Sequence, residues 1–336
     1  MRIAKLQDFL VRSYNDPKTR MYTVFIEGPS GIGKSDVIRQ TSMALSRTVE
    51  NWAGLIDLRL SQCDTTDLRG VPSITSDGRT TWNIPDFFPR KNTAGIFFMD
   101  EVTSASPAMQ AVAYQVALDR LHMPEGWMVI AAGNRQSDKG ITFNMAAPLT
   151  NRMTKLEVDA ELDGFQMHAA KCQIRPEIMA FLQERAEFLH KFDGKMAGAQ
   201  FPTPRGWFRA SAHLDLCTDP SERVEVLNGD VGAEAAATFE AFLRVWETMP
   251  KLAAIYKDPD NVKIPDKLDV KHCVVMGIAA TVDVKTFENA YKYLARMPAE
   301  FQTLAVKLAH QRDPDISKAA GFVEWALANQ RVFQRS

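Results

Sequence analysis

The residues best suited to chemistry lie in one short stretch, GPSGIGKS, at positions 28–35. Its spacing fits the pattern G-x-x-x-x-G-K-[ST], in which loop amides and the N-terminus of the following helix point at phosphate oxygens. The lysine reaches the outer phosphates, and the serine hydroxyl is a ligand for Mg²⁺. The stretch therefore predicts a nucleotide-binding loop. The residues that we assign to nucleotide contacts are Gly28, Pro29, Ser30, Gly31, Ile32, Gly33, Lys34, Ser35 and Asp36.

Two acidic residues end an apolar stretch further along the chain. Residues 94–102 read as a strand buried on both faces, with Asp100 and Glu101 at its carboxyl end. One carboxylate beside bound phosphates can hold Mg²⁺, and the other can polarise the attacking water. We therefore predict Ser35 and Asp100 as metal ligands and Glu101 as the catalytic base. Asn134, which ends the next apolar run, can orient the same water.

The surrounding sequence predicts the elements that must position these groups. The predicted strands are 22–27, 55–60, 94–102, 127–134 and 154–158. They alternate with helical patterns, so the sequence favours an α/β fold with a five-stranded parallel sheet wrapped by helices. Ligands of such sheets lie at the carboxyl ends of the strands, which is where the loop, the two acids and the asparagine fall.

Two helices of this α/β region carry distinct signals. The stretch after the loop is predicted to place Val37, Ile38, Met43 and Leu45 on one helical face. A second helix is predicted to begin with Ser106 as its N-cap and Pro107 in the first helical position.

An inserted hairpin is predicted at residues 72–83, because β-forming residues flank the turn pair Asp77-Gly78. Beyond residue 160 the strand signals stop. Four stretches read as helices there: 175–192, 204–216, 232–249 and 287–297. The predicted domains are an α/β domain over 1–160, a helical lid over 161–256 and a helical extension over 257–336.

Composition excludes some classes of protein. The chain has 336 residues and a net charge of −1, so nothing global steers it onto nucleic acid or an anionic membrane. No apolar run approaches the roughly 20 residues of a membrane span, and the charged first residues do not resemble a signal peptide. The default expectation is a cytoplasmic protein. Cys63, Cys172, Cys217 and Cys273 lie far apart and are expected to be buried thiols.

Taken together, the motifs GPSGIGKS, GIFFMDE, AAGNR, PLTNRM and FPTPRGW resemble those of AAA+ ATPases, and within them the MoxR-type branch. The resemblance covers residues 20 to about 215. It implies a large α/β domain with a helical lid, binding ATP and Mg²⁺ at the interfaces of a ring, commonly a hexamer.

The resemblance also implies roles for single residues. The phosphate loop matches the Walker A motif, Asp100 and Glu101 match Walker B, and Asn134 matches the first sensor. Arg152 matches the arginine finger, which would enter the neighbouring subunit's site, and Arg135 is an alternative for that role. Arg205 matches the second sensor, on the lid.

The function implied is a Mg²⁺-dependent ATPase that forms a ring of identical subunits and remodels a protein partner, in the manner of a MoxR-type chaperone. Members of this branch commonly act with a protein that carries a von Willebrand factor A domain. The main alternative is a DNA-processing AAA+ motor, and a further one is a nucleotide-gated scaffold with little turnover. Phe87 and Phe88 are expected to pack locally rather than to grip a partner.

Overall fold

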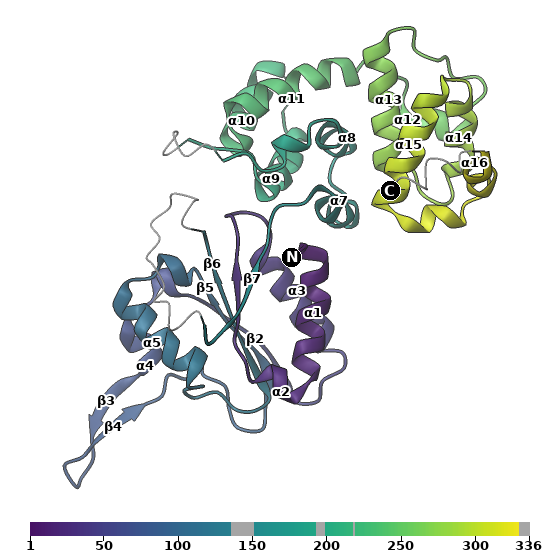
Figure 1. The fold of residues 1–336 in the computed structure, drawn as a ribbon. Coiled ribbons are helices and arrows are strands. Elements are labelled where there is room, and N and C mark those ends of the chain that lie inside the picture. The colour runs from purple at the N-terminus through teal and green to yellow at the C-terminus, as the bar shows by residue number, and fades with distance from the viewer. Residues whose placement is uncertain (136–150, 193–198, 218, 329–336) are drawn as a thin grey trace. The chain divides into compact units, whose positions relative to one another are not determined.

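The computed structural model describes residues 1–135, 151–192, 199–217 and 219–328, which belong to two units, Met1–Ala160 and Glu161–Ser336 (Figure 1). The first unit is built on a parallel sheet with strand order β2-β5-β6-β1-β7. Its strands are β1 (Val24–Glu27), β2 (Trp52–Arg59), β5 (Ala94–Asp100), β6 (Trp127–Gly133) and β7 (Thr154–Glu157). All five were predicted, and the predicted α/β fold class is confirmed.

Helices cover both faces of this sheet. Phe98 and Ile130 belong to the cluster on one face, beneath α1 and α3, while Phe97 and Val129 belong to the cluster on the other face, beneath α5. Alternate residues of one strand thus enter different cores, which is why β5 and β6 are nearly continuous apolar runs. The three covering helices are α1 (Ile3–Asn15), α3 (Lys34–Leu45) and α5 (Pro107–Leu118).

The helix α1 and the short α2 (Pro17–Arg20) that follows it were not predicted. The buried residues of α1 are Leu6, Leu10 and Tyr14, one every four residues. Ile3, Phe9 and Val11 pack against the same core, so α1 is an amphipathic helix whose pattern was overlooked.

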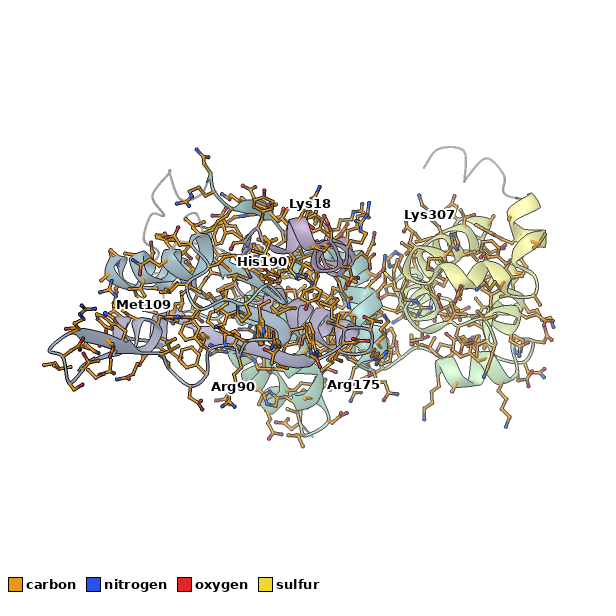
Figure 2. The ribbon with its side chains drawn as sticks, turned by 90° about the horizontal axis from the view of Figure 1, so that it is seen from below. Lys18, Arg90, Met109, Arg175, His190 and Lys307 are labelled. Atoms are coloured by element: carbon orange, nitrogen blue, oxygen red, sulfur yellow. The ribbon has the colours of Figure 1, made fainter. Side chains whose placement is uncertain are left out.

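The face predicted for α3 was partly wrong. Val37, Ile38 and Leu45 are buried as expected, but Met43 is 65% exposed. Two residues of helix turn by about 200°, so Met43 points away from the side that buries Leu45. The prediction for α5 is confirmed, since the Ser106 hydroxyl accepts the Met109 amide at 3.3 Å. Met109 itself, labelled in Figure 2, is buried against the sheet.

The inserted hairpin is confirmed and follows the short helix α4 (Thr65–Arg69). Its strands β3 (Val71–Ile74) and β4 (Thr80–Asn83) pair only with each other, in antiparallel register. Gly78 has φ +80°, the left-handed conformation that the predicted turn requires. Figure 1 shows the hairpin projecting away from the sheet of its own unit.

The predictions for isolated side chains had mixed outcomes. Phe88 is buried and stacks on Phe97 at 5.4 Å, as expected for local packing. Cys273 is buried, but Cys172, which follows α7 (Leu162–Lys171), is exposed, and Cys63 and Cys217 are partly exposed, so the expectation of buried thiols was wrong for these three. The Sγ of Cys172 lies 3.6 Å from Nε2 of His168, one helical turn earlier.

The described part of the second unit contains helices and no strands. Its α-helices are α7 (Leu162–Lys171), α8 (Pro176–Glu184), α9 (Pro204–Leu214), α10 (Pro220–Val231), α11 (Ala233–Trp246), α12 (Leu252–Lys257), α13 (Leu268–Thr281), α14 (Phe287–Ala295), α15 (Ala299–Arg312) and α16 (Phe322–Ala328). The four predicted helices are present, although α8 ends eight residues earlier than expected. Arg175, labelled in Figure 2, forms ion pairs with Glu177 and Asp215 and so joins the start of α8 to the end of α9.

Several helices of this unit were not predicted, and α13 shows why. Nine consecutive or near-consecutive residues of α13 are buried, from Val270 to Ala280. A helix that is apolar on all sides has no 3.6-residue periodicity for the sequence to reveal. Burial on every side also makes α13 the central helix of this unit, packed against α8, α11 and α15.

Candidate functional site

The predicted phosphate-binding loop connects β1 to α3 at the carboxyl edge of the sheet. A Cβ on Gly28 would stand 2.5 Å from the carbonyl oxygen of Val158, so no larger residue fits there. Gly31 and Gly33 have φ values of +77° and +97°, which favour glycine. Ile32 is buried in the core below and anchors the loop. The loop's own geometry therefore requires its glycines and leaves its amides unshielded by side chains.

Lys34 begins α3 with its side chain buried inside this loop. Its ammonium donates to the carbonyl oxygens of Gly28 at 2.6 Å and Pro29 at 2.8 Å. A third bond, of 3.0 Å, reaches Oδ1 of Asn134. The positive charge is thus held at the point where the loop, α3 and the end of β6 meet, which is where the pattern places the outer phosphates.

Ser35 and Asp100 are brought together from separate elements. The serine hydroxyl donates to Oδ2 of Asp100 at 2.7 Å, and the backbone amide of Glu101 donates to Oδ1 at 2.8 Å. A hydroxyl and a carboxylate side by side are hard oxygen ligands of the kind that Mg²⁺ takes, with phosphate oxygens and waters completing its shell. The donor set therefore fits the predicted metal site.

Glu101 leaves the sheet in an uncommon conformation. Its φ is +58°, in the left-handed region, which costs about 1–3 kcal/mol for a residue other than glycine. This turn directs its carboxylate toward Ser61, whose hydroxyl donates to Oε2. Ser61 lies just beyond β2, the strand that pairs with β5. Ser61 was not predicted. It lies beside the predicted base because of the order of the strands in the sheet, which cannot be read from the sequence.

Asn134 is fixed from both its backbone and its side chain. Its amide donates to the hydroxyl of the buried Thr103 at 2.9 Å, and its side-chain oxygen accepts from Lys34. A Cβ on Gly133 would stand 2.6 Å from the Thr103 methyl group, so the strand end is closely packed here. Thr103 was also missed, since it carries no motif and acts only by orienting Asn134.

The remaining predicted loop contacts are on the surface. Ser30 is exposed, and Asp36 is exposed and pairs with Arg39 at 3.0 Å. Arg39 also pairs with Asp57 of β2 at 3.0 Å. The side chain of Asp36 is therefore paired within α3, and its contact with nucleotide stays a prediction.

The two candidate arginine fingers lie at opposite edges of the sheet. Arg135 follows Asn134 at the carboxyl edge, where it pairs with Asp159 at 2.7 Å and donates to the carbonyl of Val158 at 3.1 Å. Arg152 precedes β7, whose register pairs Thr154 with Val24 at the amino edge. Arg135 thus belongs to the same edge as the phosphate loop of its own chain.

Arg152 is far from the loop of its own chain. Arg152 lies in the turn before β7, and the extended stretch from Thr154 to Val158 separates that turn from Gly28, which lies level with Val158. Four steps of about 3.3 Å make this stretch about 13 Å long, which is beyond the reach of one side chain. Arg152 is 58% exposed and pairs with Asp119 at 3.4 Å. The motif that contains it, PLTNRM, begins at residues 148–150, which lie outside the described residues.

Arg205 belongs to the second unit. It is exposed in the first turn of α9, whose N-cap Thr203 accepts the amide of Gly206 at 3.0 Å. Pro204 starts the helix, as the sequence pattern suggests. The structure therefore supports the predicted helix start, which carries Arg205. Arg205 belongs to a different unit from the cluster around the phosphate loop.

Among the described residues, no three or more histidine, cysteine or acidic side chains form a group able to hold a metal ion. Within the same residues, no helix combines the length and apolar character needed to cross a bilayer.

Comparison with known proteins gives one family match. Residues 23–153 match the family model described as an AAA domain of the dynein-related subfamily. The matched region holds the phosphate loop, both acids, Asn134 and Arg152. It implies nucleotide binding, and with the parallel sheet it assigns the fold of an AAA+ P-loop NTPase. No curated protein matches the sequence.

Solved structures with a similar fold are distant. A RuvB variant from Thermotoga maritima is 14% identical, with a TM-score of 0.39 over 88% of this chain and 86% of its own. NtrX from Brucella abortus, in complex with ADP, is 17% identical, with a TM-score of 0.37 over 97% and 67%. A DNA polymerase III gamma subunit-related protein from Thermotoga maritima is 10% identical, with a TM-score of 0.40 over 91% and 98%. At TM-scores below 0.5 these likenesses decide nothing further about this chain.

Proposed function

We propose that this protein is a Mg²⁺-dependent ATPase that assembles into a ring and remodels a protein partner. The observation that carries the proposal is the convergence of three elements on one loop. Lys34 contacts Asn134 from the end of β6, and Ser35 contacts Asp100 from the end of β5. The polar group for water and the acidic ligand for the metal thus each lie one hydrogen bond from the first two residues of α3.

Each residue of the cluster has a distinct part in the proposed reaction. Lys34 and the loop amides would bind the phosphates, and Ser35 and Asp100 would hold the Mg²⁺, which neutralises the charge that develops on them. Glu101 would accept a proton from the attacking water, and Asn134 would orient that water. The hydroxyl of Ser61, which donates to Oε2 of Glu101, would help to orient this carboxylate.

The ring is supported by the position of Arg152. An exposed arginine at the opposite edge of the sheet from its own phosphate loop is suited to reach the site of another copy. The contact that this requires joins the amino edge of one sheet to the carboxyl edge of the next, and repeating it generates a ring when the rotation closes. We propose Arg152 rather than Arg135 as the trans-acting finger. The second-sensor role of Arg205 belongs to the same proposal.

The finer assignment rests on the motifs alone. Their resemblance to the MoxR-type branch supports a chaperone-like role with a partner that carries a von Willebrand factor A domain. The balanced charge of the chain favours a protein over nucleic acid as the partner.

Metal removal tests the central proposal. We expect the purified protein to hydrolyse ATP with Mg²⁺ and to lose all but the background rate when EDTA is added, because Ser35 and Asp100 cannot supply the positive charge that the ion would bring to the phosphates. Phosphate release would be measured before and after chelation, with restoration by excess Mg²⁺ as the control. Hydrolysis that persists in EDTA would contradict the proposal.

The hairpin presents a surface suited to a polypeptide partner. Its register pairs Pro72 with Trp82 and Ile74 with Thr80, so the larger apolar side chains share one face. Ile74 is 82% exposed and Trp82 48% exposed, with the guanidinium of Arg69 over the indole at 5.9 Å. An apolar face on an isolated two-stranded hairpin is unusual in a protein without a binding partner.

Polar substitution of this face tests whether it contacts the partner. We expect Ile74→Ser with Trp82→Ser to keep basal ATPase activity within about two-fold, because both residues are exposed and away from the nucleotide cluster. Stimulation of hydrolysis by β-casein, an unfolded polypeptide used as the probe, should be lost. ATPase assays with and without casein make the comparison.

The opposite face of the hairpin supplies a matched control. Ser73 and Thr81 lie there with their hydroxyls 3.1 Å apart, and replacing both by alanine should leave the response to casein unchanged. Equal stimulation of the parent and the Ile74/Trp82 variant would remove the hairpin from the proposal. Stimulation by single-stranded DNA instead of casein would favour the DNA-motor alternative.

A further inference from the structure

A pocket of about 770 Å³ opens among four helices of the second unit, far along the sequence from the nucleotide loop. It is lined by residues of α8, α11, α13 and α15, and contacts among these helices hold it together (Figure 1). Its volume lies within the roughly 300–1,000 Å³ typical of ligand sites. Nothing in the proposed ATPase cycle uses it.

The interior of the pocket is apolar and aromatic. Phe181 and Phe242 are buried in its wall, and Val245 and Phe301 also line it. Leu268 stands at its edge and is 72% exposed, which is unusual for a large apolar side chain. Leu268 is itself part of the lining, and a segment of chain that crosses the opening would cover its exposed apolar surface.

Charged side chains occupy the rim. Glu184 of α8 lies 3.6 Å from Nδ1 of His272 on α13 and 3.8 Å from Nε of Arg185. Asp269, at the start of α13, adds a second carboxylate. These groups do not form a metal site, since the described residues contain no convergent set of ligands. Two carboxylates against one guanidinium leave the rim negative when His272 is neutral.

The thiol of Cys273, on the pocket wall, is affected by the same charged groups. Burial, together with the charges of Glu184 and Asp269, raises the pKa of Cys273 to about 12. The thiol is therefore neutral and unreactive, and it serves as apolar lining. The contribution of the two carboxylates to this shift places their negative field at the pocket wall.

We propose that this pocket binds a basic amphipathic segment of a protein partner, with apolar side chains inside the pocket and on Leu268 and a lysine or arginine at Glu184 and Asp269. Helical segments with apolar residues on one face commonly occupy grooves of this kind. The inference rests on the proposed function in one respect: the binding segment is taken to belong to the protein partner. Its test needs no nucleotide, so either proposal can fail while the other stands.

The experiment uses the full chain and a fluorescent helical peptide of leucine and lysine, with the leucines along one face. We expect saturable binding by fluorescence anisotropy, and binding at least about ten-fold weaker for the same peptide with glutamate in place of lysine. Ala241→Trp places a large ring at the exposed mouth of the pocket and should weaken binding of the lysine peptide by about ten-fold or more.

Ala253→Trp is the matched control, because Ala253 is an exposed helical residue that does not line the pocket. It should bind the lysine peptide as the parent does, and circular dichroism should show both variants folded. Equal binding of the lysine and glutamate peptides, or undiminished binding by Ala241→Trp, would overturn the proposal. So would binding of decylammonium at this pocket without binding of the lysine peptide, since the pocket would then take a small organic cation.

Discussion

Glu101→Gln is expected to bind ATP and to lose at least about 10² of the hydrolysis rate, because general-base catalysis contributes roughly that much or more. The glutamine keeps the shape of the side chain but cannot accept the water's proton. Lys34→Ala is expected to fail one step earlier, at binding, because its ammonium is the buried positive charge of the phosphate loop. The two substitutions should therefore separate binding from turnover.

Two measurements on each variant make this separation visible. Binding is followed with a fluorescent ATP analogue, and turnover by phosphate release. Glu125→Gln is the matched control, since it makes the same chemical change at an exposed residue before β6, at the other edge of the sheet. Parental hydrolysis by Glu101→Gln would show that the base lies elsewhere, and undiminished nucleotide binding by Lys34→Ala would remove the loop from the site.

Arg152→Ala is expected to bind ATP normally and to lose about 10³ to 10⁵ of the rate, the range that arginine fingers contribute. Binding survives because Arg152 lies at the opposite edge of the sheet from the loop of its own chain. Hydrolysis fails because the neighbouring site lacks the positive charge that stabilises the transition state. The ion pair with Asp119 is exposed and contributes little to stability, so the variant should remain folded.

Mixing the two defective proteins tests whether the arginine acts between subunits. Lys34→Ala subunits bind no ATP but still carry Arg152, so they should restore some activity when added to Arg152→Ala subunits. A mixture with Lys34→Ala/Arg152→Ala subunits, which supply neither group, is the control and should stay inactive. No rescue at any mixing ratio would point to a role within the same chain, or to Arg135.

The nucleotide cluster could be predicted because its parts are local in sequence. The loop, the two acids and Asn134 each follow an apolar strand, and a parallel sheet gathers strand ends at one edge. The residues that orient this cluster could not be predicted in the same way. Ser61 and Thr103 reach Glu101 and Asn134 across neighbouring elements, and a serine or threonine there carries no motif.

The limits of prediction were different in the helical unit. Its predicted helices were those with an apolar stripe or a clear start, such as α9, which begins at Pro204. The unpredicted α13 is buried on nearly every side, so its sequence has no polar face to mark it as a helix. The pocket that α13 lines was beyond prediction, because it depends on how four helices fail to fill the space between them.

The opposite positions of Lys34 and Arg152 on one sheet have a consequence for how such a protein would be controlled in a cell. Under the proposed arrangement, a single copy carries a phosphate loop and an arginine that cannot act on the same nucleotide. The activity per molecule therefore depends on how many copies are assembled. Output would fall faster than linearly as copies become scarce, without any inhibitor. The amount of protein made, and anything that gathers it in one place, would then act as the switch.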